Sequence, residues 1–161
     1  REKAREKGLQ SVENINALFA QADNSFGIIS MWHVLEHVAD LNKYMEQLHK
    51  ILEDDGRVLI AVPNPDSYDA KKYDTYWAAY DVPRHLFHFS KDNIQTLANK
   101  HGFKLENIKP MIYDSYYVSM LSEKYKSGSI INAAINGLIS NTKARSNNNY
   151  SSLIYILSKK G

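Results

Sequence analysis

Three residues with chemically useful side chains occur close together early in the chain. His33, Glu36 and His37 are separated by three and four positions. If the segment turns helical directly after a strand, all three side chains share one face. Two imidazoles and a carboxylate on one face suit either proton transfer or binding of a divalent metal. The alternative is that Glu36 and His37 cap the helix and hydrogen-bond a neighbouring loop.

A second group of such residues lies in the stretch Arg84-His85-Leu86-Phe87-His88. The planar guanidinium group of Arg84 could bind an acidic group of a substrate with two parallel hydrogen bonds. The alternative is an ion pair of Arg84 with Asp81 or Asp66. Histidine titrates near neutral pH, which makes it the commonest general base. The histidines that we consider for this role are His33, His37, His85 and His88.

The elements that must position these residues alternate between strand and helix. Residues 26–32 are apolar and predict a buried strand, and residues 57–62 predict a second one. Between them, Asp40 is a good N-cap for a helix with apolar residues spaced by three and four, closed by Asp54-Asp55-Gly56. This order favours an α/β fold whose first two strands are parallel. Ligands of such sheets bind at the carboxyl ends of the strands, where the first histidine group lies.

The rest of the chain continues the alternation around one long loop. Residues 66–89 are aromatic and irregular, and Tyr73, Tyr76, Trp77 and Tyr80 suit either stacking on a ligand or packing on the sheet. Downstream we expect a helix from its cap Ser90 to His101, an edge or bent strand over 103–112 containing Pro110, two helices over 116–125 and 130–143, and a last strand over 152–157.

The composition fits one globular domain without a strongly charged surface. The chain has 161 residues, of which 43% are hydrophobic and 24% are charged, ordinary values for such a domain. The formal net charge of +2 favours neither a nucleic-acid nor a membrane surface. The chain has no cysteine, and we expect a cytoplasmic protein.

Several motifs, in register along the chain, resemble class I S-adenosylmethionine-dependent methyltransferases. The run from Asp23 to Val38, which ends in Leu-Glu-His-Val, is similar to the fourth-strand motif of that family. The next helix and the strand that runs to Asn64 follow in the family's order. The stretch Arg84 to Ser90, with a helix that ends at Gly102, resembles one branch of the family. The resemblance covers residues 1–112 and the last strand.

The resemblance implies a fold and a reaction. The fold would be a partial Rossmann-like methyltransferase sheet, with the family's strands 3 or 4 to 7, flanking helices and a helical insert at about 115–145. The intact protein would transfer a methyl group from S-adenosylmethionine to a small or medium-sized acceptor, with no nucleic acid or membrane as partner.

The resemblance also implies roles for individual residues. Met31, Trp32 and His33 would line the cofactor pocket. The acceptor would be bound by Glu36, Tyr80, Arg84 and His88, and the catalytic candidates are His33, His37 and His85. Small-RNA methyltransferases hold a metal with a similar cluster, to which His33, Glu36, His37 and His85 would correspond. Because His33 replaces a carboxylate of that cluster, we favour a site without metal.

The family's glycine-rich cofactor loop is not found in this sequence, which contains no Gly-x-Gly pattern. Residues 1–7 look like the last turns of a charged helix closed by Gly8. We therefore interpret residues 1–161 as the C-terminal portion of a methyltransferase domain, and expect it to bind cofactor weakly or not at all by itself. Two alternatives stay open: another nucleotide-dependent α/β enzyme such as a dehydrogenase, and a non-catalytic interaction module of this fold.

Overall fold

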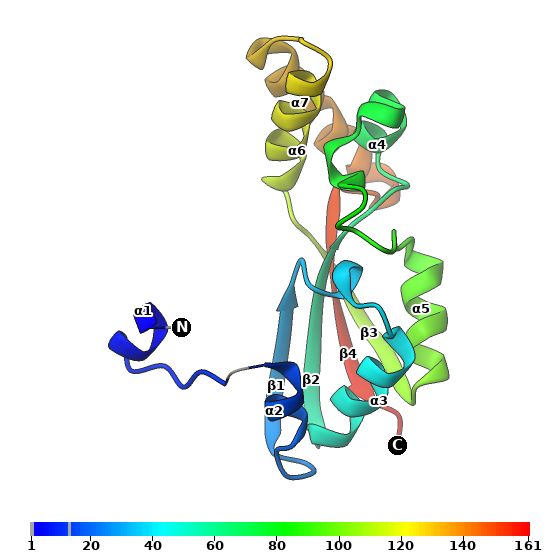
Figure 1. The fold of residues 1–161 in the computed structure, drawn as a ribbon. Helices are drawn as coiled ribbons and strands as arrows, with labels where there is room; N and C mark the ends of the chain where they lie inside the picture. The colour runs from blue at the N-terminus through cyan, green and yellow to red at the C-terminus, as the bar shows by residue number, and fades with distance from the viewer. Residues whose placement is uncertain (1, 13) are drawn as a thin grey trace.

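The computed structural model describes residues 2–12 and 14–161, which form a mixed sheet flanked by helices (Figure 1). The described strands are β1 (Phe26–Trp32), β2 (Leu52–Pro63), β3 (Phe103–Pro110) and β4 (Ser152–Lys159), in the order β1-β2-β4-β3. β1 and β2 are parallel, whereas β4 runs antiparallel to β2 and β3. The predicted α/β fold and its parallel first pair of strands are confirmed.

Two capped helices, α3 (Leu41–Ile51) and α5 (Lys91–Lys100), form the layer beside the sheet. The side chain of Asp40 accepts a hydrogen bond from the backbone N–H of Lys43, and Ser90 forms a reciprocal capping box with Asn93. Their apolar stripes meet alternate residues of the strands, so one face of the sheet carries the main core. Its fully buried members include Met45, Leu48, Val58, Ile60, Ile94, Ala98, Phe103 and Tyr155.

β1 differs from its predicted environment. We expected a buried strand, but β1 lies at one edge of the described sheet, and its face opposite α3 is open. Ile28 is 71% exposed and Trp32 is 51% exposed. The reason is that β1 has a sheet neighbour only on the β2 side, and the flanking helices cover only the face that carries Met31.

In two other strands, the effect that we predicted for a turn or a proline can be compared with the structure. β2 begins at Leu52 rather than at residue 57, because Asp54-Asp55-Gly56 forms an irregularity within the strand instead of a separate turn. β3 is an edge strand, as Pro110 predicted, since proline lacks the N–H that a central strand needs.

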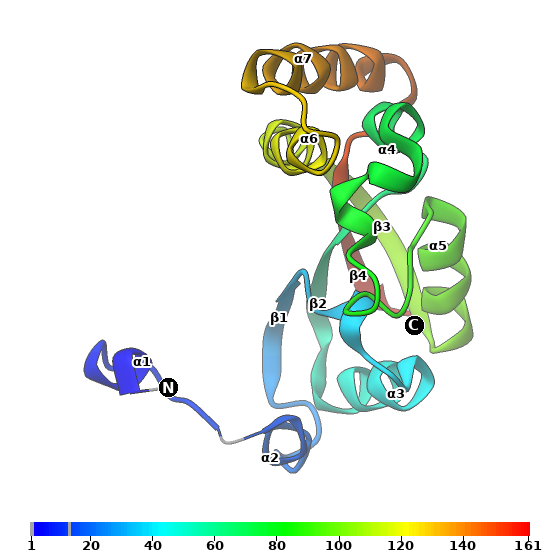
Figure 2. The same cartoon turned by 45° about the horizontal axis from the view of Figure 1, so that its top comes forward.

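The long loop and the helical insert form a second layer beyond the end of β1 (Figure 2). The loop folds into α4 (Tyr68–Tyr73) and two 3-10 turns, η2 (Asp74–Tyr76) and η3 (Ala78–Tyr80), and the insert forms α6 (Asp114–Tyr125) and α7 (Ile130–Asn147). Tyr73 and Trp77 are buried in a small core with Val118 of α6. These two aromatic side chains therefore pack the loop in place and do not face a ligand.

A buried carboxylate fixes this second layer to the sheet. Asp69 is fully buried. It accepts hydrogen bonds from the indole N–H of Trp77 and from the hydroxyls of Ser140 and Ser151, at 2.8, 2.6 and 2.7 Å. Since Ser140 belongs to α7 and Ser151 immediately precedes β4, one side chain joins the loop, the insert and the sheet.

The amino-terminal region contributes two short helices, α1 (Glu2–Glu6) and α2 (Ile15–Phe19). Gly8 follows α1 with a φ of +73°, the left-handed conformation predicted for a helix-closing glycine. The predicted helix includes Arg1, which lies outside the described residues. The chain then enters α2, whose N-cap Asn14 accepts a hydrogen bond from the backbone N–H of Ala17. In the described part of the chain, no helix combines the length and apolar character needed to cross a membrane.

Candidate functional site

His33 follows the last residue of β1 and changes the direction of the chain. Its backbone N–H still bonds to the carbonyl of Ala61 on β2, at 3.0 Å. Its φ of +53° then takes the chain into the 3-10 turn η1 (Leu35–His37). Left-handed backbone is uncommon for a residue other than glycine, and such strain often occurs at functional sites. The local structure is therefore a sharp turn and one 3-10 turn, not the α-helix on which the sequence argument relied.

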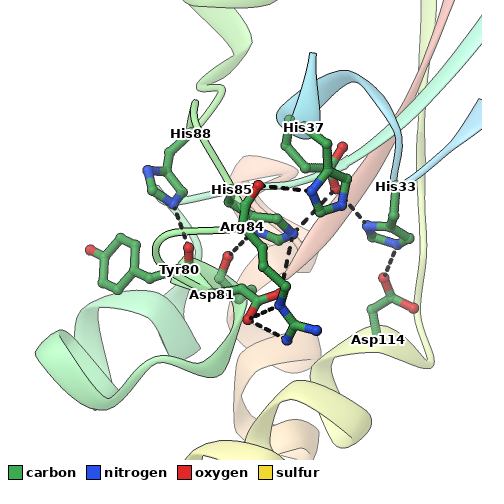
Figure 3. Close-up of polar contacts among 10 residues, drawn as sticks. His33, His37, Tyr80, Asp81, Arg84, His85, His88 and Asp114 are labelled. Atoms are coloured by element: carbon green, nitrogen blue, oxygen red, sulfur yellow. Dashed lines mark hydrogen bonds and ion pairs between the residues drawn. The ribbon is translucent and has the colours of Figure 1, made fainter. Parts of the chain in front are cut away.

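The His33 imidazole bridges two carboxylates from different parts of the fold (Figure 3). Its Nδ1 lies 3.2 Å from Glu36 Oε1, and its Nε2 lies 3.2 Å from Asp114 Oδ2 at the start of α6. Hydrogen bonds to Asp114 and then to Glu36 raise the pKa of His33 to about 9, against the opposing effect of partial burial. At neutral pH His33 is therefore a cation that donates both of its N–H groups.

Glu36 lies at the base of the site with very little solvent contact. The residue is 1% exposed, and its second carboxylate oxygen, Oε2, has no hydrogen-bond partner in the described structure. Its first oxygen faces His33 and also lies 3.9 Å from Nε2 of His85. The backbone carbonyl of Glu36 accepts the N–H of Leu86 at 2.8 Å, which holds the long loop against η1.

His37 and His85 are oriented by backbone carbonyls. A carbonyl can only accept, so Nδ1–H of His37 donates to Arg84 O at 2.9 Å, and Nδ1–H of His85 donates to Ala79 O at 2.8 Å. In the neutral form of each ring, Nε2 then carries the free lone pair. The two rings meet edge to face with their centroids 4.7 Å apart. Two basic nitrogen atoms are thus directed to the region of Glu36.

The other predicted residues of the loop have local partners. Arg84 pairs with Asp81, its Nε lying 3.0 Å from Asp81 Oδ1, so the ion-pair interpretation is confirmed for Asp81. Asp81 itself has a left-handed backbone with a φ of +40°. The ring Nε2–H of His88 donates to the carbonyl of Tyr80 at 2.9 Å, and His88 lies on the side of the site away from His33 and Asp114 (Figure 3).

A cleft of about 390 Å³ opens between this cluster and the helical insert. His33, Asp81, Arg84 and His85 form one wall, whereas the insert supplies aromatic and aliphatic side chains opposite them. On α6 these are Tyr117, Val118, Leu121 and Tyr125, and the same side of the cleft also carries Asp114 and, just before α6, Met111. The volume is at the small end of the range for ligand sites in proteins.

The predicted cofactor residues lie on both sides of β1. The side chain of Met31 is 4% exposed and belongs to the main core, so only its backbone can reach a ligand. Trp32 is half exposed and lines a second cavity, of about 300 Å³, with Pro110, Met111, Ile112, Tyr113, Asp114 and Ile154. Asp114 and Met111 line both cavities, so the His33–Asp114 pair stands where the two meet.

The structure brings the predicted residues His33, Glu36, His37 and His85 together, and adds Asp114, which the sequence did not single out. The only sequence signal for Asp114 was an acidic residue just before a predicted helix, a common place for a cap. The contribution of the insert was also missed, because the aromatic residues of α6 have no recognisable motif. Asp81 was considered only as a partner for Arg84.

The comparisons with known proteins agree with this architecture. A family model described as a methyltransferase domain matches residues 2–108. No curated protein matches the sequence. Among solved structures, a methyltransferase of Thermotoga maritima described as a possible histamine N-methyltransferase has a TM-score of 0.64 and 16% identity, covering 99% of this chain and 68% of that one.

Two further structures share the fold. A methyltransferase of Archaeoglobus fulgidus has a TM-score of 0.57 at 15% identity, covering 94% of this chain and 67% of that one. The [4+2]-cyclase SpnF has a TM-score of 0.59 at 13% identity, covering 99% of this chain and 61% of that one. The family model matches well over half of the chain and the fold agrees with it: the chain belongs to the methyltransferase-domain family and resembles the S-adenosylmethionine-dependent class I enzymes.

Proposed function

We propose that residues 1–161 are the C-terminal portion of a larger domain, and that the intact protein transfers a methyl group from S-adenosylmethionine to a small or medium-sized acceptor. The matched structures are longer than this chain, which supports the first part. The fold alone does not fix the reaction, since one neighbour is a cyclase. The observation that carries the proposal is the cleft at the carboxyl end of β1, with His85 directed toward it.

The cofactor side of the site would be the open end of β1. Trp32, half exposed above a mainly apolar cavity, fits the flat adenine or the apolar thioether chain of S-adenosylmethionine. Met31 would contribute only backbone, and His33 would lie at the boundary with the acceptor cleft. The glycine-rich loop that the family places under this cofactor would come from a segment before residue 1.

The acceptor would occupy the 390 Å³ cleft. Arg84 at its mouth is largely exposed and keeps N–H groups free for an acidic substituent beyond its bond to Asp81. Tyr117 and Tyr125 offer apolar and hydrogen-bonding surface on the insert side. Glu36, being buried, would act through His33 and His85 rather than by touching the acceptor.

S-adenosylmethionine, when bound, supplies a methyl group on a cationic sulfur. An acceptor lone pair would form the new bond to this methyl carbon, and the carbon–sulfur electron pair would return to sulfur. The chain's part is to hold the acceptor in line and to take its proton. His85 suits the proton step because its Nε2 is free, whereas His33 is already protonated at neutral pH.

Binding and turnover together test this proposal. Isothermal titration of the intact protein with S-adenosylhomocysteine should show saturable binding, weakened by Trp32→Ala and unchanged by the exposed control Tyr76→Ala. A panel of amines, phenols and carboxylic acids with methyl-labelled cofactor should then yield a labelled product. If the titration with S-adenosylhomocysteine shows no heat of binding, a non-catalytic module is favoured. If NAD shows a heat of binding and S-adenosylhomocysteine does not, a dehydrogenase is favoured.

A further inference from the structure

The hairpin of α6 and α7 projects beyond the end of the sheet and carries large apolar side chains on its exposed side (Figure 1). Tyr113, Tyr116 and Met120, on or just before α6, are spaced by three and four positions and share one face. Ile131 and Leu138, seven positions apart, share one face of α7. The exposed fractions of these five residues range from 36% for Tyr116 to 85% for Tyr113.

The contacts of α7 place the two apolar stripes side by side. Gly137 packs against Tyr116, so that a Cβ atom on Gly137 would lie 2.6 Å from Cδ1 of the ring. Asn141 donates to a backbone carbonyl just before α6, whereas Ser140 faces α4. By helical periodicity, the exposed apolar residues of α7 then lie on its α6 side. We name the resulting contiguous apolar area the hairpin surface, which consists of Tyr113, Tyr116, Met120, Ile131 and Leu138.

Basic residues flank the hairpin surface at both ends. Lys124 follows Met120 by four positions on α6, and Arg145 follows Leu138 by seven positions on α7, so each continues the stripe of its helix. Because the two helices form a hairpin, these cations lie at opposite ends of it. Both are exposed, and neither forms an ion pair within residues 2–12 and 14–161.

The acidic residues of the same segment do not balance these cations. Residues 112–147 contain two carboxylates, of which Asp114 pairs with His33 and Glu123 is buried and accepts a hydrogen bond from Tyr73. The exposed charge of the hairpin is therefore only positive. We expected no membrane partner from the net charge of +2, but that value is an average over the whole chain.

We propose that the hairpin surface binds the interfacial region of an anionic phospholipid bilayer. Helices that present apolar and aromatic side chains beside lysine and arginine lie in that region, where tyrosine is enriched. The flanking cations would meet the negative lipid headgroups. No helix needs to cross the bilayer for this mode of binding, in agreement with the described helices.

A protein partner fits the hairpin surface less well. A second copy of the chain, paired through the same surface, would bring the cations of both copies together without an acidic counterpart. A partner helix would need a groove to enter, and the seam between α6 and α7 is closed where Tyr116 meets Gly137.

Binding to a bilayer would also position the acceptor cleft. α6 lines that cleft with Tyr117, Val118 and Leu121, and it carries part of the hairpin surface on another face. The cleft would therefore lie beside the lipid headgroups. The membrane proposal does not rest on methyl transfer, since binding to vesicles is measured without cofactor or acceptor.

The test is co-sedimentation of the intact protein with vesicles of phosphatidylglycerol and phosphatidylcholine in equal parts, and with vesicles of phosphatidylcholine alone. We expect binding to the anionic vesicles that weakens with added salt and is much weaker for phosphatidylcholine. Ile131→Gln and Leu138→Gln should each weaken binding about tenfold, because each removes one aliphatic side chain from the apolar contact. Lys124→Gln and Arg145→Gln should each weaken it about fivefold.

Two exposed residues on the other side of the molecule provide matched controls. Leu86→Gln removes an aliphatic side chain that is 52% exposed, and Lys43→Gln removes a cation on α3. Both controls should bind the anionic vesicles as the parent protein does. Circular dichroism checks the folding of every variant, and Lys124→Gln, which changes only an exposed charge, keeps the test decisive if an apolar variant does not fold.

Three results would overturn the proposal: no binding to the anionic vesicles, equal binding to both kinds of vesicle, or binding that the four hairpin variants leave unchanged. Analytical ultracentrifugation without lipid identifies the alternative occupant. A dimer that Ile131→Gln or Leu138→Gln dissociates, in a protein that does not bind vesicles, would assign the hairpin surface to a second copy of the chain.

Discussion

His33 at the end of β1 and Asp114 at the start of α6 meet at 3.2 Å, and this ion pair links the sheet to the helical insert. Asp114 is the main cause of the raised pKa of His33, followed by Glu36. The same pair lies where the two cavities of the site meet. The proton on His33 therefore contributes both to the attachment of the insert, beside the Asp69 contacts, and to the shape of the site.

The first prediction concerns pH. Since the pKa of His33 rises from 6.5 to about 9 on folding, its contribution to stability is complete below pH 6.5 and is lost as the pH rises through 9. His33→Gln should lower the free energy of unfolding by about 1 kcal/mol at pH 6, a figure reduced for solvent screening, and by almost nothing at pH 10. Urea unfolding at both values measures the difference.

A matched control uses the exposed pair of Lys50 and Asp23, which contains no histidine. Asp23→Asn should change stability little at either pH. Equal losses for His33→Gln at pH 6 and pH 10 would contradict the ion-pair explanation.

The second prediction concerns the proton acceptor. His85→Gln should lower the turnover number of the intact protein about 100-fold, because general-base catalysis contributes at least that factor. The affinity for S-adenosylhomocysteine should not change, since His85 lies on the acceptor side of the cleft. The control is His101→Gln at the end of α5, and turnover of the His85 variant within twofold of the parent would remove His85 from the mechanism.

The third prediction concerns the buried carboxylate under the loop. Asp69→Ala should destabilise the protein by about 3 kcal/mol, because it leaves the polar groups of Trp77, Ser140 and Ser151 without their partner. Denaturant unfolding measures the loss. Asp55→Ala, at an exposed position on β2, should remain within about 0.5 kcal/mol of the parent protein.

The fourth prediction concerns the contact between α6 and α7. A Cβ atom on Gly137 would lie 2.6 Å from Cδ1 and 3.0 Å from Cα of Tyr116. Gly137→Ala should therefore separate the helices and cost about 1–2 kcal/mol, although alanine is the better helix former. The loss should shrink in the double variant with Tyr116→Ala, where the ring is gone, and a loss that stays undiminished would point to another cause.

Local signals in the sequence were sufficient for much of the fold. The caps Asp40 and Ser90, the apolar stripe of α3 and the β-branched run of β2 each act through residues near in sequence, so the order and type of the elements could be predicted. Pro110 marked an edge strand for the same reason, because its missing N–H is a property of one residue. The closeness of His33 and Glu36 also followed from spacing, although the turn that produces it is not an α-helix.

Only the tertiary structure decided what these residues face. Asp114 contacts His33, His85 lies near Glu36, and Asp69 accepts three hydrogen bonds. Each of these contacts joins segments that are distant in sequence, so no local pattern predicts it. The burial of Met31 and exposure of Trp32 depend on which face of β1 the helices cover. Charge and proton affinity follow from such neighbours, so the sequence could name the titratable groups of the site but not their protonation.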